Sequence, residues 1–304
     1  MKHLQLHSTL LRYVDEIARC GSIRKAALKL NVASSAVNRQ LLSLEADLGT
    51  PIFERGPRRV RLTSAGEILI HHIRRTLQDA QRAKSEIEDL KGIRRGEVSV
   101  AIIEGAATEL LTEVLKDFRT RYPSIRFLVR VLPSELVPEV VGRGDADLGL
   151  AFNVPPMRGI RRIASTVLSV GVVMRPDHPL AKAKRIRLID CLQYPICLAD
   201  RSISAGQLID RALIESAATI EPFVVCNSAE ILRAMVLEGL GITFKSSVGL
   251  KRDIREKRLV FRHLEKAPSQ HLTLIEKSGR KLPVAANVLG EALRHAIISL
   301  KDPK

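Results

Sequence analysis

The sequence has few of the features that mark secreted, membrane-spanning or disulfide-stabilised proteins. Its 304 residues include only four cysteines (Cys20, Cys191, Cys197 and Cys226), and no two of them form a Cys-x-x-Cys pair. This scarcity favours reduced, buried thiols over a disulfide framework, with a redox-sensing cysteine left open as an alternative. We find no signal peptide and no apolar run of membrane-spanning length, so we expect a cytoplasmic protein without a membrane partner.

The sequence also lacks the motifs that carry familiar enzyme chemistry. It contains no nucleophile elbow, phosphate-binding loop, zinc-ligand spacing or pair of carboxylates in a plausible site. The eight histidines are scattered, and the His71-His72 pair does not have metal-ligand spacing. We therefore expect no enzyme activity, no catalytic residue, no metal and no cofactor.

The chain does have abundant positive charge and enough apolar residues for a folded core. Its formal net charge is +16, and hydrophobic residues make up 45% of it. These values predict a globular protein with a polyanionic partner rather than a disordered chain. A length of 304 residues is enough for two or three domains.

Residues 22–51 predict two short helices joined by a tight turn. Ser22 can cap the first helix, and Ser34 can cap the second. The second helix has an apolar stripe formed by Val37, Leu41, Leu44 and Leu48. Gly49 and Pro51 would end it. Two short helices in this arrangement indicate a helix-turn-helix.

The opposite face of the second helix carries groups that suit DNA. Ser35 and Arg39 would point away from the core, with Ser34 and Asn38 beside them. Hydroxyl, amide and guanidinium groups at the start of such a helix read base edges or bind phosphates in the major groove. For this helix taken alone, a merely solvated polar face is the alternative.

A basic hairpin follows and favours the DNA-binding interpretation. Four arginines, Arg55, Arg58, Arg59 and Arg61, surround a Gly56-Pro57 turn and would form a wing against the DNA backbone. The residues that we expect to contact DNA are Ser22, Arg24, Ser34, Ser35, Asn38, Arg39, Arg55, Arg58, Arg59 and Arg61.

A long helix is predicted next, from a capping box at Ser64–Glu67 to about Leu90. Its apolar or small residues repeat at spacings of four and three: Leu69, Ile73, Thr76, Ala80, Ala83, Ile87 and Leu90. This heptad seam favours a coiled coil between two copies of the chain over a helix lying on its own domain, because little apolar surface is expected nearby. Residues 92–96 then read as a hinge.

Beyond the hinge the pattern alternates between strands and helices. Strands are predicted at 98–103, 125–131, 148–152, 167–174, 196–198, 223–226, 242–244 and 272–276, and helices at 108–121, 136–141, 205–216, 229–238 and 284–300. This order predicts parallel sheet covered by helices on both faces. Two α/β lobes joined by crossing strands would leave a cleft for a small ligand.

The N-terminal segment resembles the LysR-type transcriptional regulators of bacteria. The matching residues are Gly21-Ser22-Ile23, Ala26-Ala27, Leu30, Ala36-Val37, Leu44-Glu45, Leu48-Gly49, Ile52-Phe53, Arg55, Val60 and Leu62-Thr63-Ser64-Ala65-Gly66. Looser matches follow at Tyr122-Pro123, Gly144–Gly149, Asp177–Leu180 and Glu238–Ile242. The resemblance implies a DNA-binding regulator that responds to a small metabolite, usually as a tetramer of two dimers.

The expected fold class is a multidomain α+β protein with a winged helix-turn-helix, a dimerisation helix and a two-lobed α/β effector domain like a periplasmic binding protein. The DNA-binding domain would span 4–63, the linker helix 64–91, the hinge 92–96 and the effector domain 97–304. Lobe I would hold about 97–162 and 269–304, and lobe II about 163–268.

The resemblance also implies a set of effector-binding residues: Gly105, Thr108, Ser134, Ser202, Ser204 and Thr243. They would offer hydroxyl and backbone N–H donors to an anion or organic acid at helix N-termini, with ordinary helix capping as the alternative. At Gly105, where the family often has serine or threonine, a side-chain donor is missing.

The function expected from the sequence is therefore sequence-specific DNA binding controlled by a small-molecule effector. The expected partners are double-stranded DNA, the effector and further copies of the chain in a homodimer or homotetramer, with RNA polymerase as another candidate. The rival hypothesis is a metabolite-binding assembly module without operator specificity.

Overall fold

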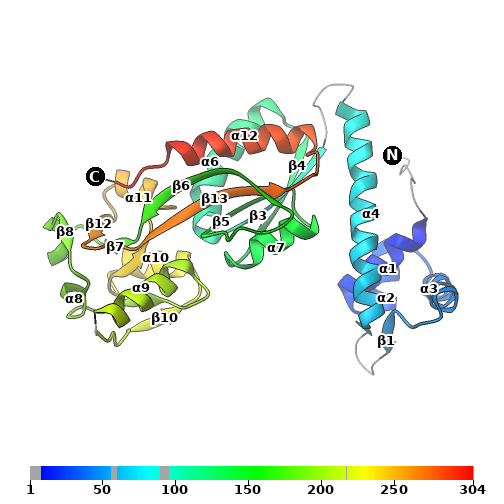
Figure 1. Cartoon of the computed structure of the whole chain (residues 1–304), viewed down its shortest axis with the longest axis horizontal. Coiled ribbons are helices and arrows are strands. Elements are labelled where there is room, and N and C mark those ends of the chain that lie inside the picture. Colours follow the sequence, from blue (N-terminus) through cyan, green and yellow to red (C-terminus); the bar gives the residue numbers. More distant parts are fainter. Residues whose placement is uncertain (1–7, 56–59, 90–95, 217, 304) are drawn as a thin grey trace. The chain divides into compact units, whose positions relative to one another are not determined.

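The computed structural model describes residues 8–55, 60–89, 96–216 and 218–303; it does not describe the side chains of Arg55 or of most residues from 78 to 89. The chain forms two compact units, one made mainly of residues 1–90 and the other of most residues from 91 onward. Each unit is described by itself below (Figure 1). In the described part of the chain, no helix is both long and apolar enough to cross a membrane.

The N-terminal unit contains four helices and a small hairpin. The helices are α1 (Thr9–Cys20), α2 (Ile23–Leu30), α3 (Ser34–Leu48) and α4 (Ser64–Asp89), and the hairpin pairs β1 (Phe53–Arg55) with β2 (Val60–Leu62) in antiparallel register. Apolar residues at helical spacing, such as Val14, Ile17, Val37 and Leu41, are at most 1% exposed and form one core. The predicted helix-turn-helix is therefore present, and Gly49 ends α3 in a left-handed conformation.

Two helix caps differ from those expected. Ala33 precedes α3, so Ser34 lies inside the helix and makes no capping hydrogen bond. At α4, the Thr63 hydroxyl accepts a hydrogen bond from the Gly66 N–H (3.0 Å) and donates one to the Pro51 carbonyl (2.7 Å), so Thr63 takes the capping role expected of Ser64. A Cβ at Gly66 would lie 2.1 Å from the Ile52 carbonyl oxygen, so only glycine fits this close approach.

The first half of the α4 seam packs on its own domain. Ile73 is fully buried in the same core as Val14 and Ile17, and Leu69 packs against that core. The expectation that α4 has little apolar surface nearby is therefore wrong for its first turns. Thr76 and Ala80 are partly exposed and Ala83 is exposed, whereas the Ile87 side chain and Leu90 lie outside the described part of the structure.

Lobe I of the C-terminal unit is built on a five-stranded sheet. Its order is β4 (Ile125–Val131), β3 (Gly96–Ile102), β5 (Leu148–Phe152), β13 (Ser269–Lys277) and β6 (Ile160–Ser169). The first three strands are parallel, but β13 is antiparallel to both of its neighbours, so the sheet is mixed rather than wholly parallel. Figure 1 shows α12 (Val284–Ser299) above this sheet and α7 (Leu136–Arg143) below it.

The helix expected from Thr108 begins four residues earlier. It consists of α5 (Glu104–Ala106), a π-helical turn (Ala107–Leu111) and α6 (Thr112–Arg121). Because the helix begins directly after β3, the Glu104 side chain lies at its first turn.

Lobe II has a second core and two smaller sheets. One sheet has the order β11 (Thr243–Lys245), β7 (Gly171–Met174), β12 (Val260–Leu264) and β8 (Arg185–Ile186), and the other pairs β9 (Cys197–Ala199) with β10 (Val224–Cys226). The helices are α8 (Leu188–Cys191), α9 (Ser204–Glu215), α10 (Ala229–Leu237) and α11 (Lys251–Arg255).

The chain passes between the lobes twice, from β6 to β7 and from β12 to β13. The strand expected at 167–174 is therefore two strands in different sheets, because the chain leaves the first sheet after Ser169. The expected lobe boundary at 162/163 falls within β6, which stays paired with β13 to Ser169.

Candidate DNA-binding face and ligand cavity

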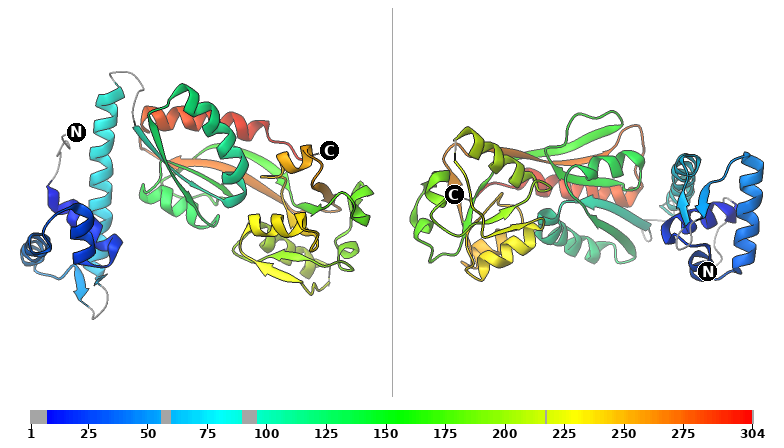
Figure 2. Two further views of the ribbon diagram at one scale, coloured as in Figure 1. Left: turned by 180° about the vertical axis from the view of Figure 1, so that it is seen from behind. Right: turned by 90° about the horizontal axis from the view of Figure 1, so that it is seen from below.

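The exposed side of α3 carries the polar groups singled out in the sequence. Ser34, Ser35 and Arg39 are exposed and Asn38 is half-buried, while Val37 on the opposite side is fully buried. Both views of Figure 2 show α3 at the edge of the N-terminal unit. The helix therefore presents hydroxyl, amide and guanidinium groups at an open surface, as insertion into a DNA groove requires.

The other residues expected at DNA have different surroundings. The Ser22 hydroxyl caps α2 by accepting from the Lys25 N–H (3.3 Å). Arg24 and Arg61 are exposed, and Arg61 lies opposite Glu54 in the hairpin. The side chain of Arg55 and residues Arg58 and Arg59 lie outside the part of the chain that the structure describes.

Glu45 supports this surface, although the sequence analysis gave it no role. Its carboxylate accepts hydrogen bonds from the backbone N–H groups of Ile52 (2.8 Å) and Phe53 (3.2 Å). This contact ties the start of β1 to α3, so the helix and the hairpin are fixed relative to each other. The Leu44-Glu45 match was the only sequence signal for this function.

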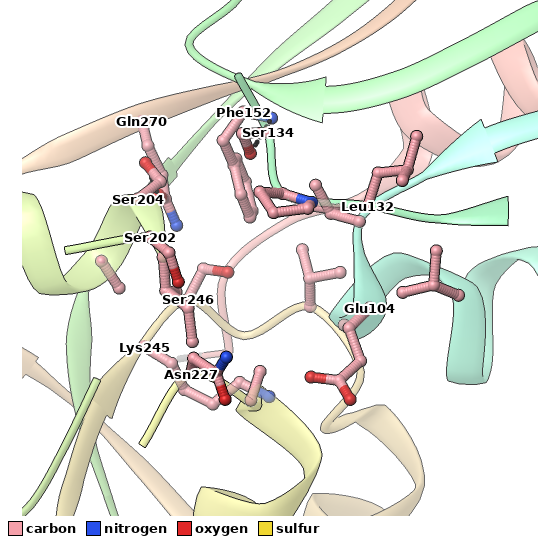
Figure 3. A pocket seen from close by; sticks show the side chains of 18 residues that line it. Glu104, Leu132, Ser134, Phe152, Ser202, Ser204, Asn227, Lys245, Ser246 and Gln270 are labelled. Atoms are coloured by element: carbon pink, nitrogen blue, oxygen red, sulfur yellow. Dashed lines mark hydrogen bonds between the residues drawn. The ribbon is translucent and has the colours of Figure 1, made fainter. Parts of the chain in front are cut away.

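A cavity of about 280 Å³ lies between the two lobes of the C-terminal unit (Figure 3). Four of the six residues expected to bind an effector line it: Gly105, Ser134, Ser202 and Ser204. Their contact with an effector stays a prediction. Much of the remaining wall is apolar and includes Ile103, Leu132, Phe152 and Val248. The cavity therefore suits a small, partly apolar molecule.

The hydroxyls of the three serines expected to bind an effector, Ser134, Ser202 and Ser204, already have partners within the chain. Ser134 accepts from the Phe152 N–H (3.2 Å), and Ser202 donates to the Asp200 carboxylate (2.5 Å). Ser204 accepts from the Asn153 amide (3.0 Å) and donates to the Gln270 carbonyl oxygen (2.9 Å). Each hydroxyl thus has a local structural function.

Two expected effector residues do not line the cavity. Thr243 is fully buried in β11, and its hydroxyl donates to the Cys197 carbonyl (2.7 Å). The Thr108 hydroxyl donates to the Glu230 carboxylate of the other lobe (3.2 Å) and is absent from the cavity wall. The backbone places them in these positions because Thr243 faces β9 and because the helix starts before Thr108.

Two buried side chains of the cavity wall, Lys245 and Gln270, each have a nitrogen without a partner in the described part of the chain, and neither residue was expected from the sequence. Lys245, at the end of β11, is 8% exposed, and Gln270, in β13, is fully buried. Among the described residues, neither the Lys245 Nζ nor the Gln270 Nε2 has a hydrogen-bond partner. Burial lowers the pKa of Lys245 to about 8. A lysine ending an apolar strand was the available sequence signal.

Glu104 is a third polar side chain in the cavity wall, and it joins the two lobes. Its carboxylate accepts from the Ser228 hydroxyl (2.8 Å) and the Glu230 N–H (3.3 Å) at the N-terminus of α10. An acidic group at this end of a helix is stabilised by the helix dipole. The N-terminus of α10 is therefore already occupied by a carboxylate of the chain itself.

The surroundings of Cys20, Cys191 and Cys197 favour the protonated thiol. Burial raises the pKa of Cys191 to about 12 and also raises the pKa of Cys197. A hydrogen bond to Glu16 (3.2 Å) raises the pKa of Cys20. Because the thiolate is the reactive form, these surroundings favour structural thiols over redox sensors.

Comparisons with known proteins match nearly the whole chain. The family model described as "Bacterial regulatory helix-turn-helix protein, lysR family" matches residues 8–67, and "LysR substrate binding domain" matches residues 91–297. The RuBisCO operon transcriptional regulator of Allochromatium vinosum is 27% identical over 292 residues, covering 93% of this chain and 96% of the relative.

Solved structures show the same architecture. A full-length OxyR variant from Pseudomonas aeruginosa, in which one cysteine is replaced by aspartate, aligns with a TM-score of 0.72 at 20% identity, covering 96% of both chains. Full-length CbnR complexed with its target DNA aligns with a TM-score of 0.67 at 21% identity, covering 94% of this chain and 98% of CbnR. The matched models, the exposed α3 face and the two-lobed unit with its cavity together show that the chain belongs to the LysR family of DNA-binding transcriptional regulators with an effector-binding domain.

Proposed function

We propose that this regulator recognises its operator through Ser35, Asn38 and Arg39 on α3, and binds flanking phosphates through Arg24 and the arginines of the β1–β2 wing. The observation that carries this proposal is the open polar face of α3, backed by fully buried Val37 and fixed to the hairpin by Glu45. Base contacts give specificity, whereas phosphate contacts give affinity that falls with salt.

Two copies of the chain would pair through α4, with residues 64–91 as the linker helix and 92–96 as the hinge. The partly exposed Thr76 and Ala80 and the exposed Ala83 support this, because they continue the seam beyond the turns that pack on the N-terminal core. Paired recognition helices would then lie about one DNA turn apart, roughly 34 Å. Two such dimers would make a tetramer, acting with RNA polymerase in the cytoplasm.

A small molecule in the cavity of the 97–304 domain would control DNA binding. The cavity joins residues of both lobes, so its occupant contacts both and can stabilise one lobe arrangement over another. A ligand shifts such an equilibrium only through different affinities for the two arrangements. Gly105, Ser134, Ser202 and Ser204 would shape the site, and an anion or organic acid is the expected class.

Footprinting of the full-length protein on its own upstream region tests this proposal. Wild-type protein should protect two half-sites, and Arg39→Ala or Asn38→Ala should weaken operator binding by about 1–3 kcal/mol. Arg211→Ala, at an exposed position of α9, is the matched control and should leave the footprint unchanged. Uniform cleavage of the DNA in the presence of wild-type protein would mean that no operator is protected. If the protein still bound a small solute, this result would support an assembly module without operator specificity instead.

A further inference from the structure

The hydrogen-bond donors around the cavity differ in whether they have a partner within the chain. The hydroxyls of Ser202 and Ser204 donate hydrogen bonds within the chain. The Ser134 hydroxyl accepts from the Phe152 N–H, a bond that does not use its own O–H. Glu104 occupies the N-terminus of α10. Within the described residues, the buried donors of the wall that lack a partner are the Lys245 Nζ and the Gln270 Nε2.

The carboxylates near Lys245 are engaged elsewhere. On α10 and α11, Arg233 pairs with both Glu230 (2.8 Å) and Asp253 (2.7 Å), and the Glu104 carboxylate of α5 is bound to Ser228. None of these carboxylates forms an ion pair with Lys245 in the described part of the chain. A buried ammonium without a counter-ion is costly, and an anion from outside the chain would remove that cost.

We propose that the cavity binds a small organic anion whose anionic group pairs with the Lys245 ammonium and whose apolar body packs against Ile103, Leu132 and Phe152. The Gln270 amide supplies a second donor to an oxygen of the same ligand. Figure 3 labels Lys245 and Gln270 among the side chains that line this cavity. The inference rests on the proposed effector site and assigns its charge recognition to one residue.

The size of the cavity limits the ligand to a small metabolite. Its volume of about 280 Å³ lies just below the roughly 300–1,000 Å³ usual for drug-sized ligands. A monocarboxylate with a branched, cyclic or aromatic body fits this volume, whereas a nucleotide or a long polyanion does not.

Pairing with an anion also couples ligand binding to protonation of Lys245. Burial lowers the pKa of Lys245 to about 8, with Arg233 lowering it further and Glu230, Asp253 and Glu104 raising it. A bound anion favours the charged form, so binding takes up a proton above pH 8. Affinity should therefore stay nearly level up to about pH 8 and fall above it, so that binding is roughly tenfold or more weaker at pH 9.5 than at pH 7.5.

Calorimetry with matched acids and amides tests the inference on the full-length protein. The probes are hexanoate, cyclohexanecarboxylate and phenylacetate, each beside its primary amide, at pH 7.5 and 9.5. We expect at least one acid to bind at millimolar or lower concentration and its amide to bind at least tenfold more weakly. Lys245→Met should abolish this preference, and Gln270→Leu should weaken binding of the acid. Lys182→Met, at an exposed lysine of the same lobe, should leave both affinities unchanged.

Three results would overturn the inference: amides that bind as well as acids, Lys245→Met protein that keeps the preference for acids, or an absence of binding for every acid. A footprint measured on the same variants separates this failure from that of the proposed function. If Lys245→Met protein still protects the operator and binds the acid unchanged, only the pairing of Lys245 with the anionic group is rejected. Loss of operator protection in wild-type protein would reject the regulator proposal itself.

Discussion

Arg39 and Lys245 are the single residues on which the proposed DNA-binding face and the proposed ligand site chiefly depend. Arg39 follows buried Val37 by two positions, so helical periodicity alone places it on the exposed face of α3. Lys245 is buried, and the charged groups that shift its pKa lie on α5, α10 and α11, which come together only in the folded chain. Local pattern therefore found the candidate DNA contacts but missed the buried cation of the cavity.

The buried charge at Lys245 should also lower the stability of the ligand-free protein. The pKa of Lys245 is about 8 when folded and 10.5 when unfolded, so the unfolded chain binds more protons between these values. Wild-type stability should therefore rise with pH across this window. Lys245→Met should be more stable than wild type by about 2–3 kcal/mol at pH 7, and by less near pH 10.

Urea unfolding, monitored by the hydrogen exchange of the β13 amides, measures this difference in unfolding free energy for the C-terminal unit. Lys182→Met, which removes an exposed ammonium of lobe II, controls for the loss of a charge. A Lys245→Met advantage of equal size at pH 7 and pH 10 would contradict the burial of a charged lysine.

At the scale of elements, the sequence predicts which helices and strands form, but not where they end or which residues cap them. Thr63 and Ser64 are equally good capping residues by type, and the choice is made by the contact of Thr63 with the Pro51 carbonyl. Likewise, residues 167–174 are uniformly suited to a strand, but the chain changes sheets after Ser169. Both differences arise from contacts with segments distant in sequence.

The cap of α4 gives a prediction with its control one residue away. Thr63→Val keeps the side-chain shape but removes the hydrogen bonds to Gly66 and Pro51, so the N-terminal unit should lose about 1–2 kcal/mol of stability. Ser64→Ala should cost much less, because Ser64 is exposed and Thr63 provides the cap. Thermal unfolding of the two variants measures the difference, and a larger loss for Ser64→Ala would restore the capping box expected from the sequence.

At the scale of the whole C-terminal unit, two carboxylates of lobe I hold helices of lobe II. Glu104 binds at the N-terminus of α10, and Glu109 accepts from the N–H groups of Lys251 (2.9 Å) and Arg252 (2.6 Å) at α11. These contacts join the two lobes directly. Sequence periodicity identified both lobes, but it carried no information on which residues face each other across the cleft.

Weakening one of these contacts should loosen the lobes while leaving each lobe folded. Glu109→Gln removes the charge that α11 binds, a change worth about 0.3–1 kcal/mol at a helix N-terminus, so exchange of the Lys251 and Arg252 amides should rise roughly two- to fivefold. Asp117→Asn makes the same charge change at an exposed position of α6 and should leave these amides unaffected. Hydrogen exchange of the ligand-free protein measures both. Equal exchange in Glu109→Gln and wild-type protein would mean that other contacts between the lobes hold α11 in place, and that a ligand must act against those contacts instead.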